Sequence, residues 1–228
     1  MAAPAFDTGG QDTTTGTTDI TTALTIANVA DRVLYCFIQD NAQAGVNSCT
    51  WNTTEALTQI ASGSFATATA NWYLYRLINP TAASANVVTV KTATGAMSQV
   101  AICYNGADQT TPNDAADEAE GNGTAAQNTV SSAAGDTTIA FCGADGSSTM
   151  APASGETERV DDATGARSYE LAGADTTVSF DITLGTSRAW VVVGLNLNAV
   201  AAAGVVGPLI GGRLVNNSML VGGRLVGR

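Results

Sequence analysis

The sequence predicts an all-β protein: an antiparallel, jelly-roll-like β-sandwich with an extended N-terminal arm and a Gly-rich C-terminal tail. Short runs of strand-forming residues recur along the chain, and Gly, Asn, Asp and Pro separate them. No segment repeats its apolar residues with a convincing helical period. About ten short strands over roughly 180 residues, joined by such turns, are typical of a sandwich, and a barrel is the less favoured alternative.

The clearest strand covers residues 177–184, where four apolar side chains alternate with Thr, Ser, Asp and Thr. That alternation is typical of a half-buried strand with its apolar face inward. Residues 33–38 and 190–193 are continuously apolar, as in strands that are covered on both faces. The expected strands are 19–27, 32–39, 46–51, 55–60, 72–79, 86–92, 97–104, 137–143, 167–171, 177–184 and 188–197.

Residues 105–176 differ in composition from the rest of the chain. They carry 13 of the 20 acidic residues and few large apolar ones, which predicts long surface loops at one end of the sandwich. Residues 114–120, closed by Gly121, form the best helix candidate. Because that segment is two turns long and polar nearly all round, we expect a loop with at most one helical turn.

The chain divides into three parts. Residues 1–17 are a Thr- and Gly-rich arm with almost nothing that could pack a core. Residues 18–200 form the sandwich domain, and residues 201–228 form a Gly/Leu/Arg repeat tail for assembly. Ordered arms and tails of this composition are expected where neighbouring subunits hold them.

Charge excludes several classes of function. The 228 residues include 9 Lys and Arg, 20 Asp and Glu and no His, so the net charge is −11. Without His there is no Ser-His-Asp or Cys-His nucleophile system and no imidazole ligand. The acidic balance argues against nucleic-acid binding, and the apolar runs are far shorter than the ~20 residues of a membrane span. The first residues lack the features of a secretory signal, so we expect synthesis in the cytoplasm.

The spacing of the four cysteines indicates no metal site. Cys36, Cys49, Cys103 and Cys142 have no metal-ligand spacing, and three of them lie in strand-like runs. We expect small buried apolar side chains, with one bridge between neighbouring strands left open. No cofactor is expected.

Two possible binding features are weaker than their structural alternatives. The acidic residues of 114–120 supply Ca²⁺-type oxygen ligands, but their spacing does not match the known Ca²⁺ loop, so a solvated acidic loop is favoured; they are Asp114, Asp117, Glu118 and Glu120. The aromatic run 72–75 resembles a carbohydrate-stacking surface. Its alternation instead favours a two-sided strand in the core.

The tail contains an internal repeat. Residues 209–215 recur as 220–226, each with two aliphatic pairs around Gly-Gly-Arg, and the tail has three Arg and no acid. An exposed apolar segment of this kind needs a cover, so we expect β-addition to a neighbouring subunit or another protein. A self-packed hairpin on its own domain is the alternative. The candidate interface residues are Leu209, Ile210, Arg213, Leu214, Leu220, Val221, Arg224 and Leu225.

Three segments together, residues 51–60, 72–80 and 104–112, resemble a β-sandwich module of tailed-phage virion proteins and of bacterial surface proteins. The resemblance covers about residues 18–200 and brings no catalytic or ligand residues with it. It implies a non-enzymatic virion protein made in the host cytoplasm, most simply a capsid decoration (cement) protein that binds the outside of the shell through its arms.

The expected partners are further copies of the chain, with a trimer favoured, and the major capsid protein or other virion proteins. No nucleic acid and no membrane are expected as partners. The alternative is a tail-fibre or cell-surface module that binds a host receptor or glycan, with loops 105–135 and 144–166 as its face and Tyr104 and Asp108 as contacts.

Overall fold

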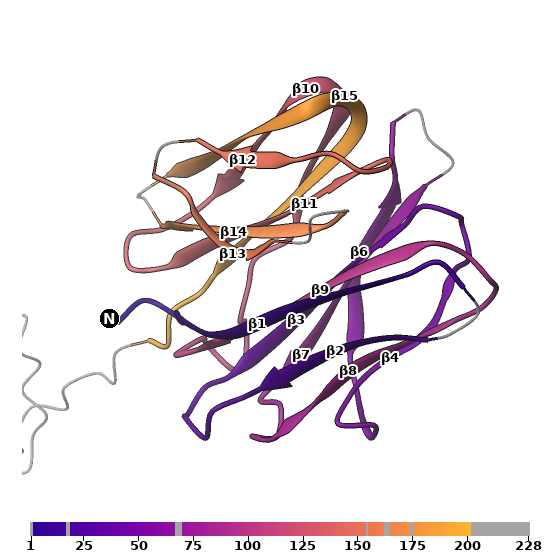
Figure 1. Ribbon diagram of the computed structural model, residues 1–228. Helices are drawn as coiled ribbons and strands as arrows, with labels where there is room; N and C mark the ends of the chain where they lie inside the picture. The colour runs from indigo at the N-terminus through magenta and orange to yellow at the C-terminus, as the bar shows by residue number, and fades with distance from the viewer. Residues whose placement is uncertain are drawn as a thin grey trace, which may run out of the picture.

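A computed structural model describes residues 2–16, 19–66, 70–153, 155–161, 165–173 and 176–201. Within those ranges the protein consists of strands and connecting turns, without a helix. The strands form three antiparallel sheets, which we call A, B and C (Figure 1). The predicted all-β, antiparallel sandwich is therefore confirmed, with three stacked sheets.

Sheet A lies in the middle of the molecule (Figure 1). Its order is β1 (Ala5–Thr14), β9 (Met97–Asn105), β3 (Val33–Asp40), β7 (Asn71–Ile78) and β6 (Thr58–Ser64). Sheet B covers one face of sheet A. Its order is β2 (Ile20–Thr25), β8 (Ser84–Lys91), β4 (Val46–Trp51) and β5 (Glu55–Ala56).

Sheet C covers the other face of sheet A. Its order is β10 (Asp117–Ser131), β15 (Thr177–Leu197), β11 (Thr137–Ala144), β14 (Arg167–Ala172) and β13 (Thr157–Asp161), and β12 (Met150–Pro152) also pairs with β15. The molecule therefore has an N-terminal half, residues 5–105 in sheets A and B, and a C-terminal half, residues 117–197 in sheet C.

Burial on both faces explains the continuous apolar runs. Along β3, Tyr35 and Phe37 pack against sheet C, whereas Cys36 and Ile38 pack against sheet B. Successive side chains of a strand point to opposite faces, so a strand between two cores has no position for a solvated residue. Every residue of β3 is accordingly buried.

Sheet C folds over on itself to make a third core. The β10–β15 ribbon changes register at Gly123/Ala125, where four residues of β15 oppose one of β10. Beyond that bulge the ribbon covers the outer face of sheet C, with Phe180, Ile182 and Leu184 in the enclosed core. A bulge increases local twist and bends the ribbon, which permits this fold.

The expectation of long surface loops over residues 105–176 is wrong. This stretch contains β10, β11, β12, β13 and β14. The expected loop or helical turn at 114–120 is wrong as well from Asp117 onward, since β10 begins there. Small residues face inward on β10 because a large neighbour fills the space: a Cβ on Gly121 would stand 2.6 Å from Cζ2 of Trp190.

The other expected strands agree closely with the structure, with two exceptions. The expected strands 177–184 and 188–197 are one bent strand, β15, and the expected strand 55–60 is divided between β5 of sheet B and β6 of sheet A. The N-terminal arm differs. Instead of reaching out from the domain, its residues 5–14 form β1, which pairs with β9 of the chain's own sheet A.

Candidate functional site

The candidate interface residues of the tail lie outside the described residues, which end at 201. What the structure does show is where the body leads into that tail. The last residues of β15 continue to Ala199 and Val200, which pair with Ala107 and Gly106 of the connection between β9 and β10. The tail therefore follows directly from an anchored segment.

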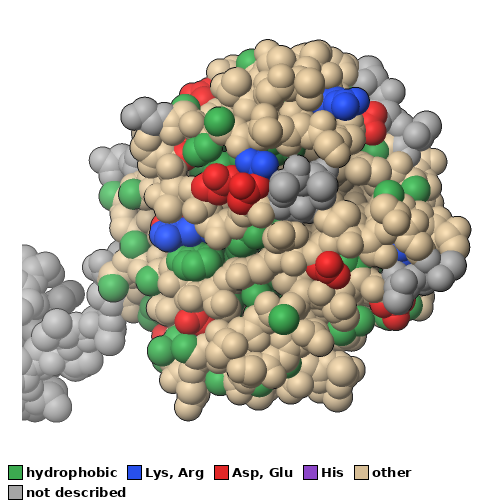
Figure 2. All heavy atoms as spheres, in the orientation of Figure 1, with side chains coloured by type: hydrophobic (Ala, Val, Ile, Leu, Met, Phe, Trp, Pro, Cys, Tyr) green, Lys and Arg blue, Asp and Glu red, His purple; other side chains and the backbone are tan. Residues whose placement is uncertain are grey.

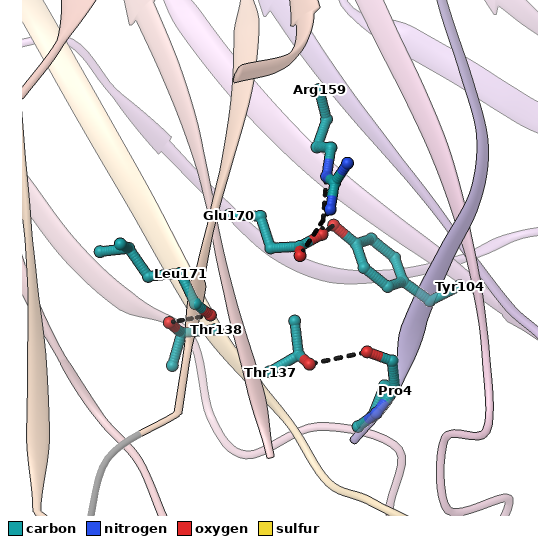
Figure 3. Close-up of polar contacts among 7 residues, drawn as sticks. All are labelled: Pro4, Tyr104, Thr137, Thr138, Arg159, Glu170 and Leu171. Atoms are coloured by element: carbon teal, nitrogen blue, oxygen red, sulfur yellow. Dashed lines mark hydrogen bonds and ion pairs between the residues drawn. The ribbon is translucent and has the colours of Figure 1, made fainter. Parts of the chain in front are cut away.

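Both ends of the described body meet at one place (Figure 1). We call it the terminal pole, and it comprises residues 3–4, 106–107, 137 and 197–200. The Val200 N–H donates to the carbonyl of Gly106 at 3.2 Å. Gly106 has a positive φ of 74°, and an added Cβ there would lie 3.9 Å from the Ala3 carbonyl and from Pro4 Cα. The Thr137 hydroxyl, next to Leu197 in the sheet, donates to the Pro4 carbonyl at 2.7 Å (Figure 3).

Near this pole, a polar and aromatic cluster joins the two halves (Figure 3). The Tyr104 hydroxyl of β9 donates to Glu170 Oε2 of β14 at 2.6 Å. Arg159 of β13 donates to both oxygens of Glu170, at 2.9 and 2.7 Å. Its guanidinium lies 4.8 Å from the ring centroid of Phe6, which meets Tyr104 edge to face at 5.7 Å. Phe6 of β1 is thus fastened to sheet C.

The pKa shifts in this cluster are those of hydrogen-bonded groups that hold the two halves together. Burial and the neighbouring Glu170 carboxylate raise the pKa of Tyr104 well above its ordinary value, so the phenol stays a proton donor. The hydrogen bond to Glu170 raises the pKa of Arg159 as well. Glu170 is already engaged by three charge-assisted or hydroxyl donors, which occupies it as an acceptor.

The predicted glycan face is not formed as expected. Tyr104 is fully buried and bound to Glu170, so its side chain offers no surface contact. Within residues 105–135, residues 117–131 form strand β10 instead of a loop. Asp108 is exposed, but its carboxylate accepts the Thr110 and Thr111 N–H groups at 2.7 and 2.9 Å, which lowers its pKa. That arrangement is a self-contained turn.

The aromatic run 72–75 packs in the cores, as favoured from its alternation. Trp72 and Leu74 lie between sheets A and C, while Tyr73 and Tyr75 contact the core between sheets A and B. The surface has a different character: on the face in Figure 2, uncharged polar groups and backbone predominate, and charged side chains form small scattered groups.

The acidic residues considered as Ca²⁺ ligands do not converge on one another. Glu118 and Glu120 lie on the exposed face of β10, whereas Asp117 lies on the opposite face and its carboxylate accepts the Ser131 N–H at 3.1 Å. Burial, followed by the charge of Glu120, raises the pKa of Glu118. Among the described residues, no group of three or more His, Cys, Asp or Glu side chains is arranged to hold a metal ion.

The four cysteines are buried and free, which confirms their expected burial. Burial raises the pKa of Cys103 and of Cys142 to about 12. Cys36 of sheet A and Cys49 of sheet B interact across the core; burial raises the pKa of Cys36, whereas the hydrogen bond from Cys36 lowers that of Cys49. None of these buried thiols meets the partially exposed, electropositive surroundings of a reactive cysteine.

An open hollow of about 640 Å³ lies beside the terminal pole, lined by residues 28–32, Ile78, Asn79 and Gln109. Its one cation, Arg32, is already engaged: the guanidinium donates to the carbonyls of Pro80 and Val29 at 2.9 and 2.7 Å. Arg32 therefore links two loops, and its N–H groups donate to neutral oxygens of the protein itself.

Comparison of the chain with protein-family models, with curated proteins and with solved structures gives no significant match. Within the described ranges there is also no helix that is long and apolar enough to cross a membrane. The terminal pole is thus the candidate functional site, defined by geometry alone.

Proposed function

We propose that this chain is a non-enzymatic structural protein of a phage virion, a decoration protein on the outside of the capsid shell. One observation carries the proposal: both ends of the β-sandwich body meet at the terminal pole, and the aliphatic repeat tail follows from that pole. A body held at one end by its extensions presents the remainder of its surface outward.

Charge supports an assembly role for the tail. Residues 1–204 contain 6 Lys and Arg against 20 Asp and Glu, a balance of −14, whereas residues 205–228 carry three Arg and no acid. Each copy therefore has an acidic body and a basic, apolar extension. Arg213 and Arg224, at equivalent positions of the repeat, can bind carboxylates of a neighbour.

The body also has an edge that suits β-addition. Strand β6 lies at one edge of sheet A, and within the described residues only β7 pairs with it. Its outer row of backbone groups can accept a further strand, with backbone hydrogen bonds for affinity and alternate side chains for specificity. Tail-to-edge pairing between copies would build a homo-oligomer, and we favour a trimer.

Truncation after Gly204 tests the proposal. We expect the shortened chain to keep its circular dichroism and melting temperature but to lose oligomerisation, measured by native mass, and incorporation into particles. Normal assembly of the truncated chain overturns the role of the tail.

Point variants keep the length constant. Leu214→Asp with Leu225→Asp places charge at aliphatic positions of both repeats, and we expect assembly to fail. The matched control, Asn216→Asp with Asn217→Asp, adds the same charge between the repeats and should assemble. Imaging of labelled particles then separates shell from tail: a label confined to tail fibres overturns the decoration role in favour of receptor or glycan binding.

A further inference from the structure

The two flanks of the sandwich made by sheets A and C differ. On one flank, β1 lies over β13, and a Cβ on Gly9 would stand 2.6 Å from Cγ2 of Val160. Since both sheets extend away from that flank, their other edge strands, β6 and β10, lie on the opposite one. Ile60 of β6 and Ala116, next to β10, accordingly pack against the same core. We call β6 and the first arm of β10, residues 117–123, the β6/β10 flank.

The chain covers the edge next to β1 with its own side chains. Strand β2 is an edge strand of sheet B and lies beside β1. The Thr21 N–H of β2 donates to Asp12 of β1 at 3.1 Å, and the Ala27 N–H, just beyond β2, donates to Asp7 at 2.9 Å. Backbone groups that are capped in this way are less available to a strand of another chain.

On β6, by contrast, backbone groups point outward without a pairing strand. The Phe65 N–H donates to the Ala70 carbonyl at 3.0 Å, at the end of the β6–β7 ladder. Residues of an antiparallel ladder alternate between facing their partner and facing away from it, so Ser62 and Ser64 direct their N–H and carbonyl groups away from β7. Within the described residues, only β7 pairs with β6.

The first arm of β10 presents a second outward row. The Asp145 N–H, just after β11, donates to the Ala189 carbonyl at 2.8 Å, so odd-numbered residues in this part of β15 face β11 and even-numbered ones face β10. Glu118 and Glu120 are paired with odd-numbered residues of β15, so their N–H and carbonyl groups point away from it. Among the described strands, β10 pairs only with β15.

The tail matches this flank in length. Each repeat, 209–215 and 220–226, has seven residues. Strand β6 has seven residues, and the arm of β10 before the bulge at Gly123 also has seven. The connection between the repeats, residues 216–219, can span roughly 16 Å when extended, more than the ~10 Å that separates stacked sheets.

The tail and the flank are also complementary in charge. Strands β6 and β10 carry three acidic residues, Asp117, Glu118 and Glu120, and no Lys or Arg. The side chains of Glu118 and Glu120 are exposed on one face of β10. The tail has three Arg and no acid, and Arg213 and Arg224 occupy equivalent positions of its repeats.

On the basis of the assembly role proposed above for the tail, we propose that the β6/β10 flank receives the tail of a neighbouring copy, with one repeat added to each edge. Backbone hydrogen bonds to the two outward rows supply the affinity. A tail arginine beside Glu118 and Glu120 supplies charge-assisted hydrogen bonds that favour this basic segment over an acidic one. The surface is therefore specific to the chain's own tail.

The edge variant Ser62→Pro with Glu120→Pro tests the proposal in the full chain. Proline removes one outward N–H from each edge and leaves the bonds to β7 and β15 in place. We expect oligomerisation, measured by native mass over a dilution series, to weaken at least about tenfold. The matched control, Ser62→Ala with Glu120→Ala, keeps both N–H groups and should retain more of the oligomerisation than the proline pair.

A charge variant covers the case in which the proline pair fails to fold. Glu120→Gln should weaken oligomerisation roughly threefold at about 0.05 M NaCl and less at about 0.5 M. Asp19→Asn removes an exposed acid outside the flank, before β2, and should oligomerise as the parent does. An equal effect of the two substitutions contradicts a specific role for the flank.

Mixing two defective variants distinguishes this surface from the role of the tail. Leu214→Asp with Leu225→Asp keeps an intact flank, whereas the edge variant keeps an intact tail. We expect each to be monomeric alone and the mixture to form a dimer with one copy of each. If the tail variant fails to assemble while the edge variant and Glu120→Gln assemble as the parent does, the flank is not the site although the tail still acts. A parent that is monomeric, with a melting temperature that falls on truncation after Gly204, shows that the tail docks on its own body and overturns the neighbouring copy as its source.

Discussion

The two halves of the molecule stabilise their buried cations in different ways. In the N-terminal half, Arg32 and Lys91 are each 9% exposed and bind mainly neutral acceptors. Lys91 Nζ donates to the carbonyls of Gly16 and Gly95 at 2.5 and 2.8 Å. Backbone carbonyls thus replace the water that these charges lose on folding.

In the C-terminal half, carboxylates share that role with one backbone carbonyl, since the Arg167 guanidinium also donates to the carbonyl of Met150. Arg167 is 5% exposed, and its guanidinium lies 2.8 Å from Asp161 Oδ1 and 3.3 Å from Glu158 Oε1. Arg159 pairs with Glu170 at 2.7 Å. Among the described residues, all three ion pairs join β13 to β14.

Because of this difference, we expect pH and salt to affect the stability of the two halves unequally. A carbonyl keeps its dipole at any pH, whereas a carboxylate loses its charge on protonation and is screened by salt where it is exposed. We therefore expect acid and salt to weaken the β13–β14 edge before they affect sheets A and B.

The largest expected effect is at the contact between sheets A and C, where a variant tests whether the two halves unfold as one cooperative unit. Phe37 of β3 stacks on Phe141 of β11, with ring centroids 5.5 Å apart, and on Trp72 at 6.3 Å. Phe37→Ala should lower the free energy of unfolding by about 3–5 kcal/mol, measured in urea, and both halves should still unfold in one transition. Val29→Ala, at a 41% exposed side chain, is the control; two separate transitions would show independent halves.

The second largest effect is expected from removing one buried cation in each half. Arg167→Met and Lys91→Met should each cost about 2 kcal/mol, because each leaves acceptors without their donor. In 1 M NaCl the cost of Arg167→Met should shrink, since Asp161 is 55% exposed in its side chain and open to screening, while the cost of Lys91→Met should persist. Equal salt dependence of the two costs would remove the distinction between the halves.

A smaller effect concerns hydrogen bonds from tyrosine. Tyr104 donates to the charged Glu170, whereas Tyr75 donates to the neutral Gln59 at 3.1 Å. Bonds to charged groups are the stronger, so Tyr104→Phe should cost about 1.5–3 kcal/mol and Tyr75→Phe about 1 kcal/mol. Thermal or urea unfolding measures both; a larger loss in Tyr75→Phe would contradict the ranking.

The sequence predicts the N-terminal half better than the C-terminal half, for a physical reason. Strand β3, in the middle of sheet A, lies between two cores and must be apolar on both faces, so residues 33–38 are conspicuous in the sequence. On β10, Gly121 lies against the ring of Trp190 in β15. Because Trp190 fills this space, β10 needs no large apolar residue there, and its sequence does not look like a strand. Strand β1 is hidden similarly, since Gly9 lies against Val160 of β13, where an added Cβ would be 2.6 Å from its Cγ2.

The sequence pointed to only one member of the polar cluster around Asn196. Asp114 stood among the acidic residues considered for Ca²⁺, but its neighbours in the fold are Asp136, Asn196 and Asn198. The pairing of β11 with β15 brings Asp136 next to Asn196, and the bridge between Asn113 and Leu197 brings Asp114 there, so no local spacing in the sequence predicts the cluster. The tail, whose repeat is evident in the sequence, stays a prediction.

The smallest expected effect is a pH dependence set by two carboxylates whose pKa values shift in opposite directions: Glu156 in the C-terminal half and Asp108 in the connection between β9 and β10. Glu156 Oε1 accepts the Asp181 N–H at 2.6 Å, but Oε2 is buried without a partner. Burial is the main cause that raises the pKa of Glu156, with the charge of Asp181 adding to it. The folded state therefore holds this proton more tightly than the unfolded state, and stability falls as pH rises from the usual Glu range through the raised value.

Glu156→Gln removes that ionisation, so its free energy of unfolding should fall less than that of the parent between pH 4 and pH 7, and the two should differ most at the higher pH.

Asp108→Asn is the control, for which we expect the opposite pH dependence of stability. Hydrogen bonds from the Thr111 and Thr110 N–H groups lower the pKa of Asp108, so its contribution is present above the usual Asp range and is lost as pH falls through the lowered value. The Asp108→Asn variant should therefore be less stable than the parent at pH 7 and approach it in acid. Urea unfolding at several pH values measures both differences, and parallel pH profiles for Glu156→Gln and the parent would show that burial of this carboxylate has no energetic consequence.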